Sequence, residues 1–257
     1  MQLKTLFFLL FILFSSVLFA QKADDLVKDG DKLKDSYNNQ SALDTYLKAD
    51  KLSPNNWEIL WRISRSYVDI GAHMPEGTSD QKDKQLAVFQ KGLSYADQAV
   101  KYGPNQSITY LRRAIANGRI ALFKGVFSVG SVVNSVKSDC EKAIQLNNGG
   151  NYTQALAHYV FARTHAKISE KWAPARAVLG LGWADNEVAL TEYQKAVSIF
   201  PNYRMFYLDY ARSLVREDKY SEAKDFINKC INSPQQEEDD LSRLAEAKLL
   251  LNEIRNK

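Results

Sequence analysis

The sequence predicts an all-α protein built from repeated pairs of helices. Three observations support this prediction. A pattern of small and aromatic residues recurs along the chain, apolar residues follow the helical spacing of three and four, and no alternating apolar run suggests a strand. We therefore expect helix pairs that stack into a right-handed solenoid and end in a capping helix.

The recurring pattern marks the second helix of a pair. Its first copy is Ala42, Tyr46, Ala49 and Pro54, and Ala189, Tyr193, Ala196 and Pro201 repeat the same residue types at the same offsets. A third copy is Ala223, Ile227, Cys230 and Pro234, with the proline shifted by one position. Small residues allow two antiparallel helices to approach closely, and the large side chain between them fills the next gap. The proline ends the helix and begins the turn into the next pair.

A small residue also stands twelve positions before each copy, where it would mark the closest contact with the first helix. These residues are Gly30, Ala177 and Ala211. The last helix carries an apolar stripe at Leu241, Leu244, Ala247, Leu251 and Ile254. The acidic residues EEDD precede it, where the helix dipole favours negative charge. We expect this helix to cap the solenoid.

The other helix pairs are longer than the repeat requires. We predict a single domain over residues 21–257 with about five helix pairs and insertions near 71–88, 122–137 and 166–176. The first insertion is polar and rich in glycine and proline, which favours a loop. The second includes an unusually apolar stretch from Phe123 to Val136.

These repeats resemble tetratricopeptide (TPR) repeats, with A-x3-F-x2-A followed by proline in the second helix. A narrower resemblance lies in WEILWRISRSYVDIG, YADQAVKYGPNQSITYLRRAI, LFKGVFSVGSVVNSVKSDCEKAIQLN and CINSPQQEEDDLSRLAEAKLLL, which are similar in order and spacing to the regulator of microtubule dynamics family. That resemblance implies a helical repeat fold and protein-interaction activity. Two departures are Tyr159, in place of a small residue, and Asn148, in place of the usual proline.

The N-terminus is typical of a secretory signal peptide. Lys4 precedes an apolar run from Leu6 to Ala20, which is shorter than the roughly 20 residues of a bilayer-spanning helix. We expect cleavage after Ala20, no stable membrane span afterwards, and a periplasmic or extracellular protein. An uncleaved anchor is the alternative. Export would separate the chain from tubulin, so the microtubule role of eukaryotic relatives is not transferred, and an exported bacterial relative fits better.

Composition and motifs exclude several functional classes. The formal net charge is +4 and the charges are interspersed, without the basic stripe of a nucleic-acid binder. Cys140 and Cys230 are too few for a disulfide scaffold and are predicted to be buried. His158 and His165 are seven residues apart and lack a ligand set for zinc. No catalytic or nucleotide-binding motif is present, so we expect no enzyme, no cofactor and no metal.

The candidate binding residues are those that would line the inner face of the first helices. The repeat register places Trp61, Arg65 and Val68 there in one pair, and Leu111, Ile115 and Arg119 in the next. Tryptophan and arginine often anchor a partner peptide, and arginine can pair with a carboxylate in bidentate fashion. The structural alternative is that Trp61 packs between repeats and the arginines are solvated.

Two functions remain open at this stage. The first is a non-catalytic scaffold or adaptor that binds an unidentified protein or peptide. The second is a carrier of a lipid or another apolar small ligand, with Phe123 to Val136 forming part of a pocket. A basic face would favour the scaffold, and an apolar cavity would favour the carrier.

Overall fold

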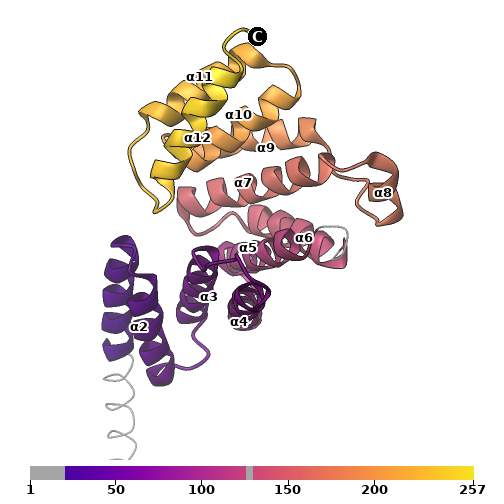
Figure 1. The fold of residues 1–257 in the computed structure, drawn as a ribbon. Helices are drawn as coiled ribbons and strands as arrows, with labels where there is room; N and C mark the ends of the chain where they lie inside the picture. Colours follow the sequence, from indigo (N-terminus) through magenta and orange to yellow (C-terminus); the bar gives the residue numbers. More distant parts are fainter. Residues whose placement is uncertain (1–20, 126–129) are drawn as a thin grey trace, which may run out of the picture. The chain divides into compact units, whose positions relative to one another are not determined.

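The structure, a computed structural model, describes residues 21–125 and 130–257. Within these ranges all regular secondary structure is helical (Figure 1). The chain divides into two compact units, which meet in sequence between Pro104 and Asn105. We call them the first and second units and describe each by itself.

The described part of the first unit, residues 21–104, contains two helix pairs. A helix over residues 21–35 packs with α2 (Asn39–Leu52), and α3 (Trp57–Ala72) packs with α4 (Ser79–Tyr102). Side-chain caps begin three of these helices: Asn38 accepts from the Ser41 amide, Asn56 from the Glu58 amide, and Thr78 from the Gln81 amide. Each cap satisfies an amide that has no partner within its own helix.

The predicted packing pattern of the first pair is confirmed. Ala42, Tyr46 and Ala49 are fully buried. A Cβ added at Gly30 would lie 2.4 Å from the Tyr46 ring, so only glycine lets the aromatic side chain approach this closely.

The polar segment predicted to form a loop near residues 71–88 is helical from Ser79 onward. Thr78 and Gln81 form a capping box, and Lys84 pairs with Asp80 one turn earlier at 2.7 Å. These local interactions stabilise a polar helix whose side chains are mostly exposed. The loop prediction is therefore wrong for this part of the segment.

Outside residues 126–129, the second unit contains three helix pairs, a short helix and a final helix. The pairs are α5 (Ser107–Lys124) with α6 (Gly130–Leu146), α7 (Gly150–Ser169) with α9 (Asn186–Ile199), and α10 (Arg204–Arg216) with α11 (Tyr220–Asn232). The short helix α8 (Ala173–Val178) lies between α7 and α9, and α12 (Asp240–Glu253) packs against α10 and α11. The first helices of successive pairs also contact one another, from α5 to α7, from α7 to α10 and from α10 to α12.

The placement of Ala177 as the small residue opposite Ala189 is wrong. Ala177 is exposed in α8, and the partner of α9 is α7, where Ala162 is fully buried. The short segment around α8 separates the two halves of this pair in sequence, so a fixed spacing of twelve could not find the true contact.

Stacked aromatic rings fill the core of the second unit. The rings of Tyr159 and Phe206 stack with centroids 4.8 Å apart, and Tyr203 and Tyr193 also lie against them. Tyr159, where the repeat predicts a small residue, is accordingly buried. Aromatic pairs of this kind add to the free energy gained by burial alone.

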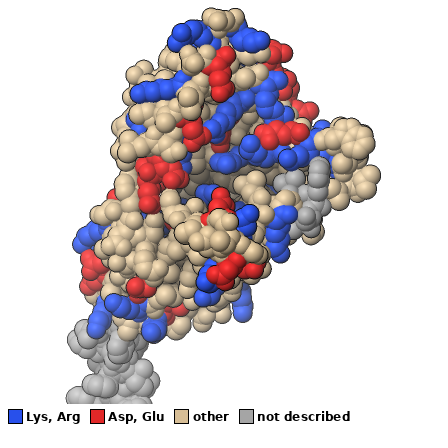
Figure 2. Space-filling model, in the orientation of Figure 1, with Lys and Arg blue, Asp and Glu red and all other residues tan. Residues whose placement is uncertain are grey.

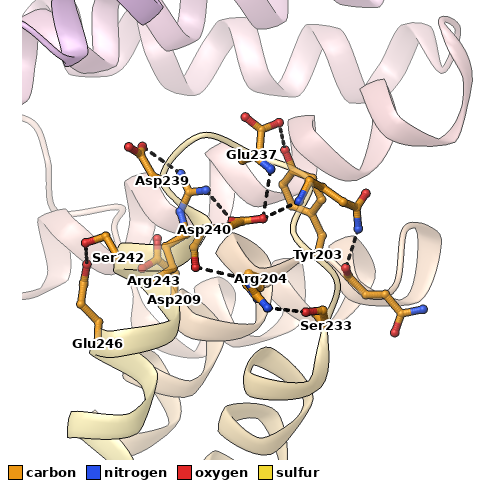
Figure 3. Close-up of polar contacts among 12 residues, drawn as sticks. Tyr203, Arg204, Asp209, Ser233, Glu237, Asp239, Asp240, Ser242, Arg243 and Glu246 are labelled. Carbon is orange, nitrogen blue, oxygen red and sulfur yellow. Dashed lines mark hydrogen bonds and ion pairs between the residues drawn. The ribbon is translucent and has the colours of Figure 1, made fainter. Parts of the chain in front are cut away.

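A polar turn fixes α12 to α10 (Figure 3). The buried Arg204 guanidinium donates to the Ser233 carbonyl at 2.6 Å and to the Asp240 carbonyl at 3.2 Å. The Asp240 carboxylate accepts from the amides of Gln236 and Glu237, and it also pairs with Arg243. Asp240, the first residue of α12, therefore orders the preceding turn, in addition to the predicted interaction of acidic residues with the helix dipole.

No helix among the described residues is both long and apolar enough to cross a bilayer. The predicted signal peptide, residues 1–20, lies outside the described residues.

Candidate functional site

The six residues predicted to line a binding face are divided between the two units. Val68 and Leu111 are buried in the core, so the prediction that these two are accessible is wrong. Val68 on α3 and Leu111 on α5 lie on helix faces that pack against neighbouring helices, so both side chains point into the core. Ile115 is half-buried against the core, and Arg119 is exposed.

Arg65 belongs to a network in the first unit that we call the Asp31 cluster (Asp31, Tyr46, Arg62 and Arg65), and Trp61 lies against it. The Asp31 carboxylate accepts from the Tyr46 hydroxyl at 2.6 Å and pairs with Arg62 at 3.0 Å and Arg65 at 3.3 Å. Trp61 covers both guanidiniums, whose Cζ atoms lie 4.3 and 5.1 Å from its ring centroid. Arg65 is therefore mainly an internal ion-pair residue.

The second unit repeats this chemistry in a network that we call the Asp209 cluster (Tyr159, Arg163, Asp209, Arg212 and Glu246). The Tyr159 hydroxyl donates to Asp209 Oδ2 at 2.7 Å, and Arg163 Nη1 lies 3.1 Å from the same oxygen. Arg212 Nη1 donates to Asp209 Oδ1 at 2.8 Å, and its Nη2 pairs with Glu246. Helices α7, α10 and α12 thus each contribute a charged side chain.

The electrostatics of Asp209 are set by its arginines. Burial alone raises the pKa of this carboxyl, but the Arg163 guanidinium, the Tyr159 hydroxyl and the Arg212 guanidinium more than offset that effect. The pKa of Asp209 consequently lies below its ordinary value of 3.8. Asp209 is ionised at neutral pH and holds both guanidiniums in place.

Exposure distinguishes the two clusters. In the Asp31 cluster the arginine side chains are 17% and 12% exposed and the carboxylate is 36% exposed. In the Asp209 cluster the carboxylate is 11% exposed and the arginines are 37% and 43% exposed. In the Asp31 cluster the carboxylate is therefore the more exposed group, whereas in the Asp209 cluster the arginine side chains are more exposed than the carboxylate.

The basic side chains of the second unit form a visible band. Figure 2 shows Lys and Arg side chains spread over the face that α7 contributes, with carboxylates between them. Arg163 uses only Nη1 in its hydrogen bonds, and among the described residues its Nη2 has no partner. The Arg163 side chain as a whole is 37% exposed, and its Nε is buried without a hydrogen-bond partner.

The sequence contained a signal for these two arginines. Arg163 and Arg212 each directly follow a fully buried alanine on the first helix of a pair, as Arg65 follows the buried Ser64. For Arg163 this signal was hidden because Ala177, and not Ala162, was assigned as the small residue of its pair. Arg212 follows the correctly assigned Ala211 but belongs to a pair for which no binding residues were predicted.

The histidines and cysteines have structural environments. His158 Nδ1 lies 2.6 Å from Glu192, and His165 Nδ1 accepts from the Asp185 amide. Cys140 and Cys230 are free and buried, which confirms their predicted burial. Among the residues that the structure describes, no group of three or more histidine, cysteine and acidic side chains is arranged to hold a metal ion.

Comparisons with known proteins agree with the helical-repeat fold. The structure is similar to a thermophilic TPR protein from Thermus thermophilus, with a TM-score of 0.62, 16% identity and coverage of 88% of this chain and 99% of that one. It is also similar to the Pseudomonas aeruginosa protein pilF, with a TM-score of 0.53, 11% identity and coverage of 91% and 93%. At these identities the likeness establishes the TPR-type fold.

A relative in sequence is regulator of microtubule dynamics protein 3 from Rattus norvegicus, 24% identical over 217 residues. The match covers 82% of this chain and 43% of the relative, so the chain spans less than half of that protein's length. The family described as "Regulator of microtubule dynamics protein 1-3" matches residues 19–255. With a TPR-type fold and a family match over nearly its whole length, the chain belongs to the regulator of microtubule dynamics protein 1-3 family.

Proposed function

We propose that this protein is a non-catalytic, exported scaffold that binds an acidic segment of a partner protein at the Asp209 cluster. The observation that carries the proposal is the pair of half-exposed guanidiniums, Arg163 and Arg212, fixed on opposite oxygens of one buried carboxylate. A TPR-type solenoid supplies the scaffold, and paired arginines recognise carboxylates well.

The cluster is organised for binding before a partner arrives. Asp209 and the Tyr159 hydroxyl already orient Arg163, so less side-chain entropy is lost when a ligand binds. Arg163 Nη2 offers a donor, and Arg212 Nη2 is occupied by Glu246, which is 44% exposed. An exposed ion pair of this kind contributes only about 0–1 kcal/mol, so a partner carboxylate can replace Glu246 at little cost.

The carrier alternative has no specific support. It depended on the apolar stretch from Phe123 to Val136, of which residues 126–129 lie outside the described residues. Val133 and Val136 in the described part are buried in the core between helices. These side chains contribute to packing.

The binding proposal predicts opposite effects for two substitutions. Arg212→Gln should weaken binding of an acidic peptide by about tenfold. A hydrogen bond to a charged group contributes roughly 1.5–3 kcal/mol, and the half-exposed Arg212 corresponds to the lower end of that range. Glu246→Gln should strengthen binding by about two- to fivefold, because it removes the internal competitor for Arg212. The measurement is fluorescence anisotropy with labelled peptides that carry two glutamates at varied spacing.

The control is Glu253→Gln on the same helix, which removes the same charge at an exposed position outside the cluster. It should leave the dissociation constant within about twofold of wild type, because long-range surface charges are screened by salt. The proposal is wrong if Arg212→Gln and Arg163→Gln, both folded by circular dichroism, bind every peptide as wild type does.

Export is a separate part of the proposal and rests on the apolar run from Leu6 to Ala20. We expect the mature protein to start at or near Gln21. Edman sequencing of the protein recovered from the periplasm or medium would show this N-terminus, whereas an intact Met1 in the membrane fraction would contradict cleavage.

A further inference from the structure

The segment between α7 and α9 carries an exposed apolar tip that the peptide-binding proposal does not use. We call residues 171–184, which include α8, the α8 segment. Figure 1 shows it projecting beyond the end of α7. Trp172 is 73% exposed and Val178 is 88% exposed, and the neighbouring Ala173, Pro174 and Ala177 are exposed as well.

The base of this segment is firmly held. Leu181 is fully buried in a core formed with Ala121, Val133 and Ile168. Arg176 Nη1 donates to the Ala184 carbonyl at 2.5 Å, and the Leu181 amide donates to the Arg176 carbonyl at 2.7 Å. These contacts hold the base of the segment against the helices, while the apolar side chains of the tip face outward.

Trp183 adds a further attachment at the end of the segment. Its Nε1 donates to Asn134 on α6 at 2.8 Å, and its ring packs edge-on against His165 on α7. The two tryptophans of the segment thus differ in role, because Trp183 joins it to the helices and Trp172 faces solvent.

We propose that the α8 segment inserts its tip into the interfacial layer of a bilayer that contains anionic lipids. Tryptophan favours the boundary between headgroups and acyl chains, where its ring is apolar and its N–H stays hydrated. Val178 and the adjacent small residues add apolar surface without polar side chains. A tip that penetrates only to the headgroup boundary needs no membrane-spanning helix.

The charge of the segment identifies the kind of surface. Lys171 and Arg176 are its only charged residues, which gives it a charge of +2. Glu170, immediately before it, is paired with Lys167 at 3.0 Å. Basic residues beside an apolar anchor are attracted to anionic lipid headgroups.

The size of the tip favours a membrane over a protein partner. A stable protein interface buries about 800 Å² on each side and surrounds its anchors with packed neighbours. Here a helix of six residues offers two large apolar side chains on a projection. Insertion into lipid needs no complementary surface, so a small anchor of this shape can act there.

Brominated lipids test the insertion directly in the full chain. Bromine quenches tryptophan only at close range, and residues 1–20 contain none of the four tryptophans, so the N-terminal apolar run gives no quenching signal of its own. The protein is mixed with vesicles of phosphatidylcholine and phosphatidylglycerol, with and without bromine near the top of the acyl chains. Wild type should lose about a quarter of its emission, the share of one tryptophan in four.

Trp172→Tyr should abolish most of this quenching, and Val178→Ser should reduce it. Leu241→Ser is the matched control, because Leu241 on α12 is also well exposed and lies outside the segment; it should leave the quenching unchanged. Lys171→Glu should shift the vesicle titration to higher lipid concentration.

Three results would overturn the proposal: unquenched wild-type emission, equal quenching after Trp172→Tyr, or equal quenching in vesicles without phosphatidylglycerol. Circular dichroism of each variant verifies that the fold is retained. Peptide binding at the Asp209 cluster is measured without lipid, so the two proposals succeed or fail separately.

Discussion

Phe206→Ala is expected to lower the free energy of unfolding by about 3–5 kcal/mol, the usual cost of replacing a fully buried phenylalanine with alanine. Phe206 is completely buried, stacks on the Tyr159 ring with centroids 4.8 Å apart, and lies 4.6 Å from the Tyr203 ring. Removing its ring leaves a cavity among side chains that cannot close over it, because they are held by hydrogen bonds at their outer ends.

Urea unfolding followed by far-UV circular dichroism measures this effect. Phe226→Ala is the control, because Phe226 is only partly buried against Tyr207 and Tyr210. It should cost about half as much, in proportion to the smaller apolar area that it removes from water. If both variants unfold at the wild-type urea concentration, the aromatic core of the second unit is not packed as described.

The Phe206→Ala substitution should also disturb the geometry of the Asp209 cluster. The ring supports Tyr159, whose hydroxyl donates to Asp209. We therefore expect Phe206→Ala to weaken acidic-peptide binding even where the protein remains folded.

Asp209→Asn is the second substitution with a large expected effect. It should lower the free energy of unfolding by about 2–4 kcal/mol. Removing one member of a buried ion pair typically costs about 3–5 kcal/mol, and the half-exposed guanidiniums of Arg163 and Arg212 recover part of this through hydration. The amide NH₂ would also face a guanidinium or the Tyr159 hydroxyl, where an acceptor is needed.

The pH dependence of this loss follows from the lowered pKa of Asp209. A carboxyl whose pKa is lower in the folded chain stabilises the fold above its unfolded pKa, which for Asp209 is the ordinary value of 3.8. That contribution disappears as the pH falls through the lower folded value. The difference in unfolding free energy between wild type and Asp209→Asn should therefore be constant near neutral pH and shrink below about pH 4.

Asp31→Asn is the matched comparison, because Asp31 has the same partners by type but a more exposed carboxylate. Asp31→Asn should lower the free energy of unfolding by less than Asp209→Asn does, since water can replace part of the lost ion pairing. A stability difference for Asp209→Asn that grows as the pH falls would contradict the assignment of Asp209 as a stabilising anion.

The sequence alone determined the class of fold. Small residues at fixed offsets dictate which faces of two helices can approach, and this constraint is local enough to read without a structure. The positions Ala42, Tyr46, Ala49, Ala189 and Ala223 are all buried where the pattern placed them. The family resemblance in the same segments is confirmed by the match over residues 19–255.

The candidate site required the tertiary structure. Arg65 follows the repeat register, yet Asp31 from another helix pair draws it into an internal ion pair. Arg163 stands on a helix whose partner is separated from it by the α8 segment, so no fixed spacing could place it. An arginine is mainly structural where its own side chain is the buried member of the ion pair, as in Arg65. It faces solvent where the carboxylate is the buried member, as in Arg163.

The sequence by itself determined the helical repeat, because close helix packing restricts the residue type at each contact and small residues therefore recur at regular intervals. Only the tertiary structure decided that Asp209 lies beneath Arg163 and Arg212, and that Trp172 remains in solvent while Trp183 packs. The physical reason is that ion pairing and exposure depend on side chains from helices distant in sequence, whose meeting leaves no regular spacing.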